Sequence, residues 1–111
     1  MKQADAERIL EYAKENGGAT FDQDGNIYTM DRGYIVATEN LRRCYNDKCS
    51  IATIIDLHIP SLYGVWYDEG VLHIDVVAWV PSPSLAFAIG RHNSERAVWD
   101  CEERDILVIG Y

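Results

Sequence analysis

The stretch from residue 62 to residue 80 constrains the fold more than any other part of the chain. Two β-prone runs, Tyr63–Tyr67 and Val71–Val77, flank the turn-forming residues Asp68-Glu69-Gly70. In the second run the large apolar residues stand at every other position: Leu72, Ile74 and Val76. A period of two gives a strand one buried face. The stretch therefore predicts a long β-hairpin with one face in the core.

The N-terminal third predicts a helix followed by short strands. Ala6, Ile9, Leu10 and Ala13 fall on one helical face, so residues 4–16 should form an amphipathic helix that ends at Gly17-Gly18. Residues 19–39 contain two turn signals, Asp24-Gly25 and Arg32-Gly33, between β-prone runs. This pattern predicts a meander of three strands.

The middle of the chain is less regular. Residues 40–49 are polar and carry three bases, Arg42, Arg43 and Lys48, which favours a break between elements. Residues 51–58 have isoleucines at helical spacing, yet their β-branched composition suits a strand. Both assignments stay open, and we favour a short helix that ends before Pro60.

The C-terminal third predicts a helix and two strands. Ser82 is placed to cap a helix whose first residue is Pro83, and Gly90 should end it. Two β-prone runs follow, Ala97–Asp100 and Ile106–Ile109. Because most strands are consecutive in the chain, we expect an α+β fold. Its sheet should be mainly antiparallel, with the N-terminal helix and a second short helix packed on it, in a single domain over residues 1–111.

The charge of the chain limits the classes of partner that it is expected to bind. Eighteen acids against ten bases give a formal net charge of −8. Such a chain is repelled by nucleic acid phosphates and by anionic membrane surfaces, and is steered toward basic protein surfaces. We therefore expect a protein partner, and neither direct nucleic acid binding nor membrane binding. Three cysteines, no secretory leader and no apolar run near the roughly 20 residues of a membrane span predict a cytoplasmic protein.

Acids and aromatics at two predicted turns form the candidate partner-binding set. The hairpin contributes Trp66, Tyr67, Asp68 and Glu69, and the C-terminal strand pair contributes Asp100, Glu102, Glu103 and Asp105. Carboxylates at turn tips could occupy a basic groove, and Trp and Tyr are enriched at interfaces. The alternative is that these acids are solvated turn residues and that the aromatics pack in the core.

Catalytic and metal-binding patterns are weak. Asp22-Gln23-Asp24-Gly25-Asn26 resembles part of a calcium loop, but its twelfth residue is Gly33 rather than Glu, so we interpret it as a hairpin turn. Cys44 and Cys49 form one cysteine pair, whereas structural zinc sites usually have two pairs of ligands. We therefore expect no metal, no cofactor and no catalytic residues, and we do not expect an enzyme.

The segment from residue 63 to residue 101 resembles a known group of proteins. Its motifs are Gly64-Val65-Trp66-Tyr67-Asp68, Leu72-x-Ile74-Asp75-Val76, Ala86-x-x-Ile89-Gly90-Arg91-x-Asn93 and Ala97-Val98-Trp99-Asp100. This hairpin–helix–strand pattern is similar to that of small acidic accessory proteins of phages, plasmids and gut bacteria, among which are anti-CRISPR proteins. The resemblance implies an inhibitor of a host defence complex, located in the host bacterial cytoplasm, with a CRISPR effector as the partner.

Two other functions remain open. The chain could be a homodimeric binding or regulatory module of a mobile element, in which the hairpin aromatics form a symmetric contact. It could also be a small metal protein or enzyme built on Cys44, Cys49 and the histidines. For the inhibitor, the bases Arg42, Arg43 and Lys48 are further candidates for contact with the partner.

Overall fold

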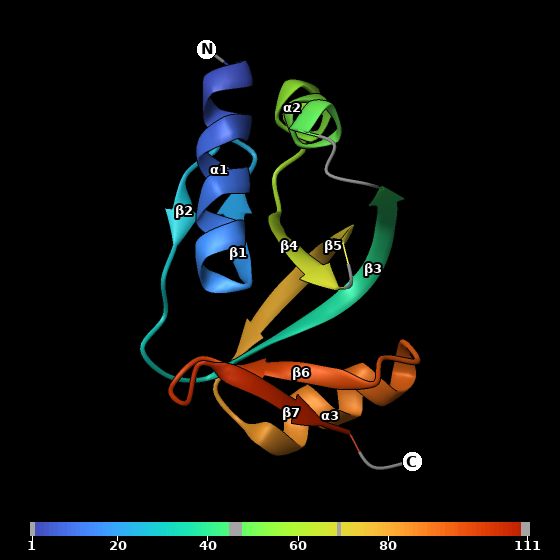
Figure 1. Ribbon diagram of the computed structural model, residues 1–111. Helices are drawn as coiled ribbons and strands as arrows, with labels where there is room; N and C mark the ends of the chain where they lie inside the picture. The colour runs from blue at the N-terminus through green and yellow to red at the C-terminus, as the bar shows by residue number, and fades with distance from the viewer. Residues whose placement is uncertain (1, 45–47, 69, 110–111) are drawn as a thin grey trace. The chain divides into compact units, whose positions relative to one another are not determined.

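The computed structural model describes the backbone of residues 2–44, 48–68 and 70–109, and the side chains of residues 4–41, 51–66 and 70–109. Within these ranges three helices and seven strands confirm the predicted α+β class, with an antiparallel sheet and an N-terminal helix (Figure 1). The strands follow the order β2-β1-β4-β5-β3-β6-β7. β7 and β2 are therefore the two edges of the sheet.

The chain divides into two compact units. The first comprises Met1–Tyr28 and Asn40–Val76, and the second comprises Thr29–Glu39 and Val77–Tyr111. Two strands, β3 (Tyr34–Cys44) and β5 (Val71–Val80), run from one unit into the other. Each unit has its own cluster of buried apolar side chains. The expectation of a single domain over residues 1–111 stays a prediction.

The first unit packs two helices on part of the sheet. Helix α1 (Lys2–Asn16) buries Ala6, Ile9 and Ala13 completely, as its apolar spacing predicts. Helix α2 (Lys48–Leu57) confirms the helix that we favoured for residues 51–58. Ile51 and Ile55 lie one turn apart and are buried in this core. Burial of that face therefore outweighs the weak preference of isoleucine for strands.

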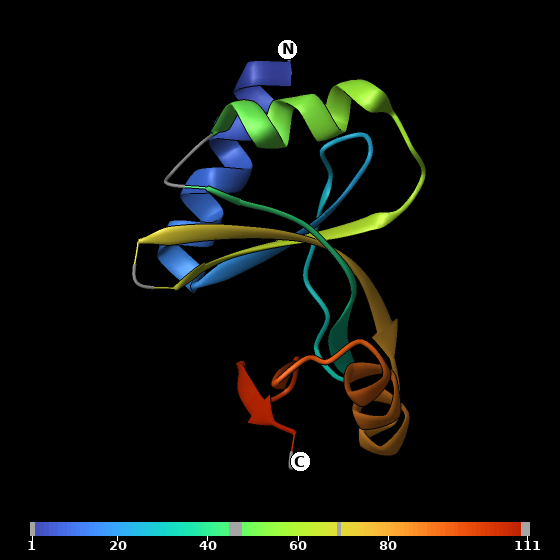
Figure 2. The same cartoon turned by 90° about the vertical axis from the view of Figure 1, so that its right-hand side faces the viewer.

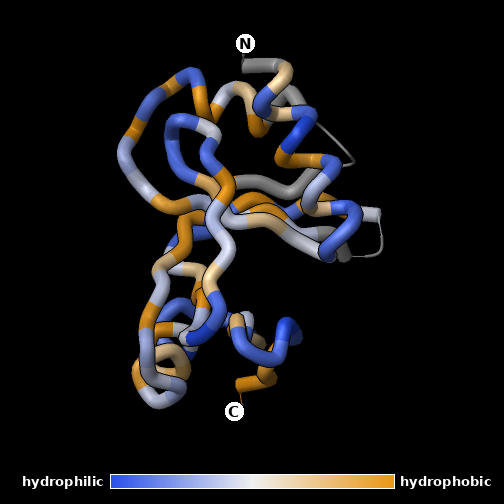
Figure 3. Tube along the Cα trace, turned by 90° about the vertical axis from the view of Figure 1, so that its left-hand side faces the viewer, coloured by the Kyte–Doolittle hydropathy of each residue, from blue (hydrophilic) through white to orange (hydrophobic). Residues whose placement is uncertain are grey.

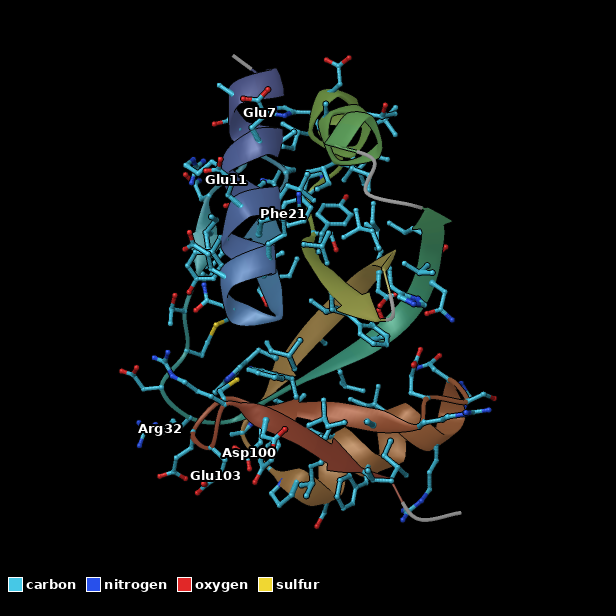
Figure 4. All side chains as sticks on the ribbon, in the orientation of Figure 1. Glu7, Glu11, Phe21, Arg32, Asp100 and Glu103 are labelled. Carbon is cyan, nitrogen blue, oxygen red and sulfur yellow. The ribbon has the colours of Figure 1, made fainter. Side chains whose placement is uncertain are left out.

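The strands of the first unit supply the other side of its core. β1 (Gly18–Asp22) pairs antiparallel with β2 (Ile27–Tyr28) and with β4 (Leu62–Asp68), which forms the predicted hairpin with β5. Phe21 is fully buried and stacks on Tyr63, with ring centroids 5.6 Å apart (Figure 4). The alternation predicted for this hairpin holds at Leu72 and Ile74, which are fully buried in β5. It is wrong beyond Ile74, because Asp75 and Val77 are buried as well and Val76 is only partly buried.

The second unit is built around β6 (Ala97–Asp100), β7 (Asp105–Val108) and helix α3 (Pro83–His92) (Figures 1 and 2). The Ser82 side chain accepts a hydrogen bond from the Leu85 N–H at 3.4 Å and Pro83 begins the helix, as predicted. The core of the unit lies between α3 and the strands and buries Val36, Val80, Ala86, Val98 and Ile109.

Two boundaries differ from the sequence-based expectation. Helix α3 continues through Gly90 to His92, and Asn93 caps it. Gly90 is buried, and a side chain there would collide with Ile109 Cδ1, so this glycine allows close packing and does not end the helix. Strand β3 extends to Cys44, so the break predicted for residues 40–49 was wrong for its first half.

Candidate functional site

The turn between β6 and β7 holds one half of the predicted partner-binding set. Asp100 ends β6, Glu102 and Glu103 lie in the turn, and Asp105 begins β7 (Figure 4). Asp100 Oδ1 accepts hydrogen bonds from the N–H groups of Glu102 at 3.1 Å and Glu103 at 3.2 Å. This local hydrogen bonding is typical of aspartate in turns, and here it fixes the backbone that carries the two glutamates.

Further contacts hold the same turn in place. The Arg104 N–H donates to the Asp100 carbonyl at 2.9 Å, and Arg104 takes a left-handed backbone conformation with φ of 54°. The Cys101 N–H donates to the Gly33 carbonyl at 3.0 Å, which ties the turn to the loop before β3. Burial, with a smaller contribution from the Asp100 charge, raises the pKa of the Cys101 thiol. Cys101 therefore anchors the turn as a neutral apolar side chain.

The four carboxylates of this turn have different roles. Asp100 is partly buried and its carboxylate accepts hydrogen bonds from backbone N–H groups of the turn. Asp105 Oδ1 accepts a hydrogen bond from the Ile106 N–H at 2.8 Å. The side chains of Glu102, Glu103 and Asp105 are all exposed, but those of the two glutamates are not engaged with the backbone of the turn. Arg104 within the turn is exposed, and so is Arg32 on the neighbouring loop (Figure 4). Of the predicted acids in this unit, Glu102 and Glu103 are therefore the two best placed to meet a partner.

Strand β7 adds an apolar surface that sequence reasoning missed. Ile106 is 61% exposed and Val108 is 68% exposed, although both lie in a run of four apolar residues. Such a run is typical of a strand that is covered on both faces. In the structure only the face with Leu107 packs against the core of the second unit. Figure 3 shows the change from the hydrophilic turn to this hydrophobic strand near the C-terminus.

The other half of the predicted set lies in the first unit, on the β4–β5 hairpin. Trp66 is 43% exposed and stacks on His73, with ring centroids 4.3 Å apart and an interplanar angle of 17°. Its indole N–H donates to Asp75 Oδ2 at 3.3 Å, and Asp75 is buried. The side chains of Tyr67 and Asp68, and Glu69 as a whole, lie outside the described residues.

The calcium-like segment is a hairpin turn, as expected. Asp22 accepts hydrogen bonds from the N–H groups of Asp24 and Asn26, from the Asn26 amide and from the Tyr28 hydroxyl, the last at 2.6 Å. Burial raises the pKa of Asp22, but these hydrogen bonds outweigh it and hold the pKa below its ordinary value. The carboxylate is therefore committed to closing the turn between β1 and β2.

Of the residues considered for a metal site, the structure describes the side chains of His58, His73 and Cys101. Cys101 is buried, and His58 Nε2 lies 3.3 Å from Asp24 Oδ1 at the surface. In residues 4–41, 51–66 and 70–109 no group of three or more His, Cys, Asp or Glu side chains is placed to hold a metal ion. The side chains of Cys44 and Cys49, and those of Arg42, Arg43 and Lys48, lie outside the described residues.

Comparison with known proteins gives no relative. No protein-family model, no curated protein and no solved structure matches the chain. Among the described residues, no helix has both the length and the apolar character needed to cross a membrane.

Proposed function

We propose that the chain is an inhibitor that works by protein–protein binding and covers a basic, nucleic-acid-handling surface of a host defence complex. The partner class that we propose is a CRISPR effector. The observation that carries the proposal is the pre-ordered acidic turn, in which Asp100 fixes the backbone of two exposed glutamates. Order that exists before binding reduces the entropy lost on association.

Electrostatics support the same proposal. The net charge of −8 attracts a basic surface over long range, which raises the rate of association at low salt. The Glu102 and Glu103 side chains then supply the short-range contacts, because exposed carboxylates can pair with the Arg and Lys side chains that normally hold phosphates. The inhibitor would compete with nucleic acid and would need no catalytic group.

A phage-growth assay tests the proposal. Bacteria that carry different CRISPR types are infected with and without expression of the protein. We expect phage growth to be restored in at least one type, and for that type the purified complex should show association that slows steeply as salt rises. Absence of any effect on phage growth across the panel would contradict the CRISPR form of the proposal.

Two charge variants locate the surface. The test variant carries Glu102→Lys and Glu103→Lys, and the matched control carries Glu11→Lys and Glu15→Lys on α1, where both side chains are exposed. Both variants change the net charge by the same amount. We expect only the test variant to lose protection of phage. Equal losses in the two variants would show that total charge matters and that the turn is not the binding site.

A homodimeric binding module is the second candidate function. It is favoured by Trp66, whose ring is exposed and already held in place by the stack on His73 and the hydrogen bond to Asp75. Rigid exposed aromatics are typical anchors of protein interfaces. Light scattering over a range of protein concentration tests this candidate. A dimer that becomes monomeric on Trp66→Ala would support it, and a monomeric mass at every concentration would exclude it.

A further inference from the structure

We infer that β7 is a docking edge, to which an extended basic segment of the partner protein adds as a further strand. This inference rests on the proposed function and gives the binding mode at that site. β7 is the last strand in the order of the sheet and, among the described residues, pairs with β6 alone. An edge strand of this kind offers backbone hydrogen-bonding groups to another chain.

The register of the β6–β7 pair decides which backbone groups face the open edge. The Ile109 N–H donates to the Arg96 carbonyl at 2.8 Å, so this pair is a hydrogen-bonded one. Hydrogen-bonded and non-hydrogen-bonded pairs alternate along an antiparallel ladder. Ile106 and Val108 therefore belong to non-hydrogen-bonded pairs, and their N–H and C=O groups point away from β6.

The side chain of Asp105 limits what the edge can accept. Its Oδ1 takes the outward N–H of Ile106 at 2.8 Å. The Ile106 carbonyl and both the N–H and the carbonyl of Val108 then remain for an incoming strand. The exposed side chains of Ile106 and Val108 lie on one face and would contact apolar residues of that strand.

Charge complementarity identifies the occupant as a basic segment. β7 begins at Asp105 and follows the turn that carries Glu102, Glu103 and Arg104, all of them exposed. This end of the edge therefore has three carboxylates against one guanidinium, and Lys or Arg residues at one end of the incoming strand would meet net negative charge. A second copy of the chain fits less well. Two copies would bring together two chains of net charge −8, which repel each other.

The test uses the full chain and a synthetic peptide of about ten residues in which lysine and valine alternate, a length within the range of natural strands. A peptide of alternating lysine and glycine has the same charge and is the control. Amide hydrogen exchange is measured by NMR. We expect the lysine–valine peptide to slow exchange of the Val108 amide by at least about tenfold, and the lysine–glycine peptide to leave it unchanged. Absence of protection at Val108 would overturn the inference.

Two variants test the backbone contact itself. Val108→Pro removes the outward N–H, and Val108→Thr keeps that N–H together with a β-branched side chain. We expect Val108→Pro to weaken peptide binding by at least about fivefold, in line with the loss of one hydrogen bond, and Val108→Thr to weaken it less. Binding of Val108→Pro within about twofold of the wild type would also refute the docking edge.

The outcomes separate this inference from the proposed function. If phage protection depends on Glu102 and Glu103 but the Val108 amide stays unprotected by the peptide, the docking edge is wrong and the inhibitor stands. If the peptide protects Val108 but no CRISPR type responds to the protein, the edge stands and the CRISPR form of the proposal is wrong.

Discussion

The packing of Gly90 against Ile109 makes a quantitative prediction about the second unit. Replacing a glycine inside a helix by alanine normally stabilises a protein by about 1 kcal/mol. At Gly90, however, the new Cβ would lie well inside van der Waals contact of Ile109 Cδ1. Ile109 is 2% exposed and its N–H is bonded to Arg96, so it has little room to move. Overpacking of this kind costs about 1–3 kcal/mol.

The steric cost should therefore exceed the gain in helix propensity. We expect Gly90→Ala to lower the free energy of unfolding by about 1 kcal/mol, which corresponds to a fall in Tm of roughly 4 °C for a chain of this size. Ile109→Val alone should cost about 0.5–1.5 kcal/mol, because it removes one buried methyl group. That methyl group is Cδ1, the atom with which the alanine collides.

The double variant decides between this account and simple additivity. With Cδ1 removed, the alanine keeps its helix preference without the clash, so Gly90→Ala with Ile109→Val should lie within about 0.5 kcal/mol of the wild type. Urea unfolding followed by far-UV circular dichroism measures all four proteins. If the two single effects simply add, the contact between Gly90 and Ile109 does not control the packing of α3, and the reasoning fails.

Three further predictions concern other contacts. Gly33→Ala should destabilise the protein by about 2–4 kcal/mol in thermal unfolding, because φ is 83° and a Cβ would collide with the Trp79 indole. Gly17→Ala is the control: its φ of 84° is similar but no atom lies within 4 Å of the new Cβ, so it should cost only about 1 kcal/mol. Equal losses would refute the clash. The free energy of unfolding of the wild type should exceed that of Asp22→Asn by its full amount above the unfolded pKa of about 3.9, because the folded pKa of Asp22 is lowered. The difference should vanish as pH falls through the folded pKa, and urea unfolding between pH 7 and pH 2 measures it. A difference that does not depend on pH would contradict this prediction. Cys101 should react with iodoacetamide at least about a hundredfold more slowly in the native protein than in urea, because burial raises the pKa of its thiol. Mass spectrometry of the peptide that contains Cys101 measures the labelling. Rapid labelling of the native protein would show that the turn opens.

Local sequence patterns determined most elements of this protein, but the three-strand meander predicted for residues 19–39 was wrong, because β3 lies between β5 and β6 in the sheet and not beside β2. Helical spacing predicted α1 and favoured α2, alternation predicted the β4–β5 hairpin, and Ser82 with Pro83 predicted the start of α3. These features depend on residues within a few positions of one another, and side-chain periodicity follows from the geometry of a single helix or strand. The same local reasoning placed the acids Asp100–Asp105 on one turn.

Only the tertiary structure decided which residues are covered and which are open. The sequence predicts that Gly90 ends a helix. In the structure Gly90 lies inside the helix and allows it to pack closely against Ile109, a residue distant in sequence. The run Ile106–Ile109 is apolar at every position, so its sequence does not distinguish buried from open residues, and the place of β7 at the end of the strand order leaves Ile106 and Val108 exposed. Strand order and close contacts between distant segments depend on long-range packing, which cannot be deduced from a local sequence pattern.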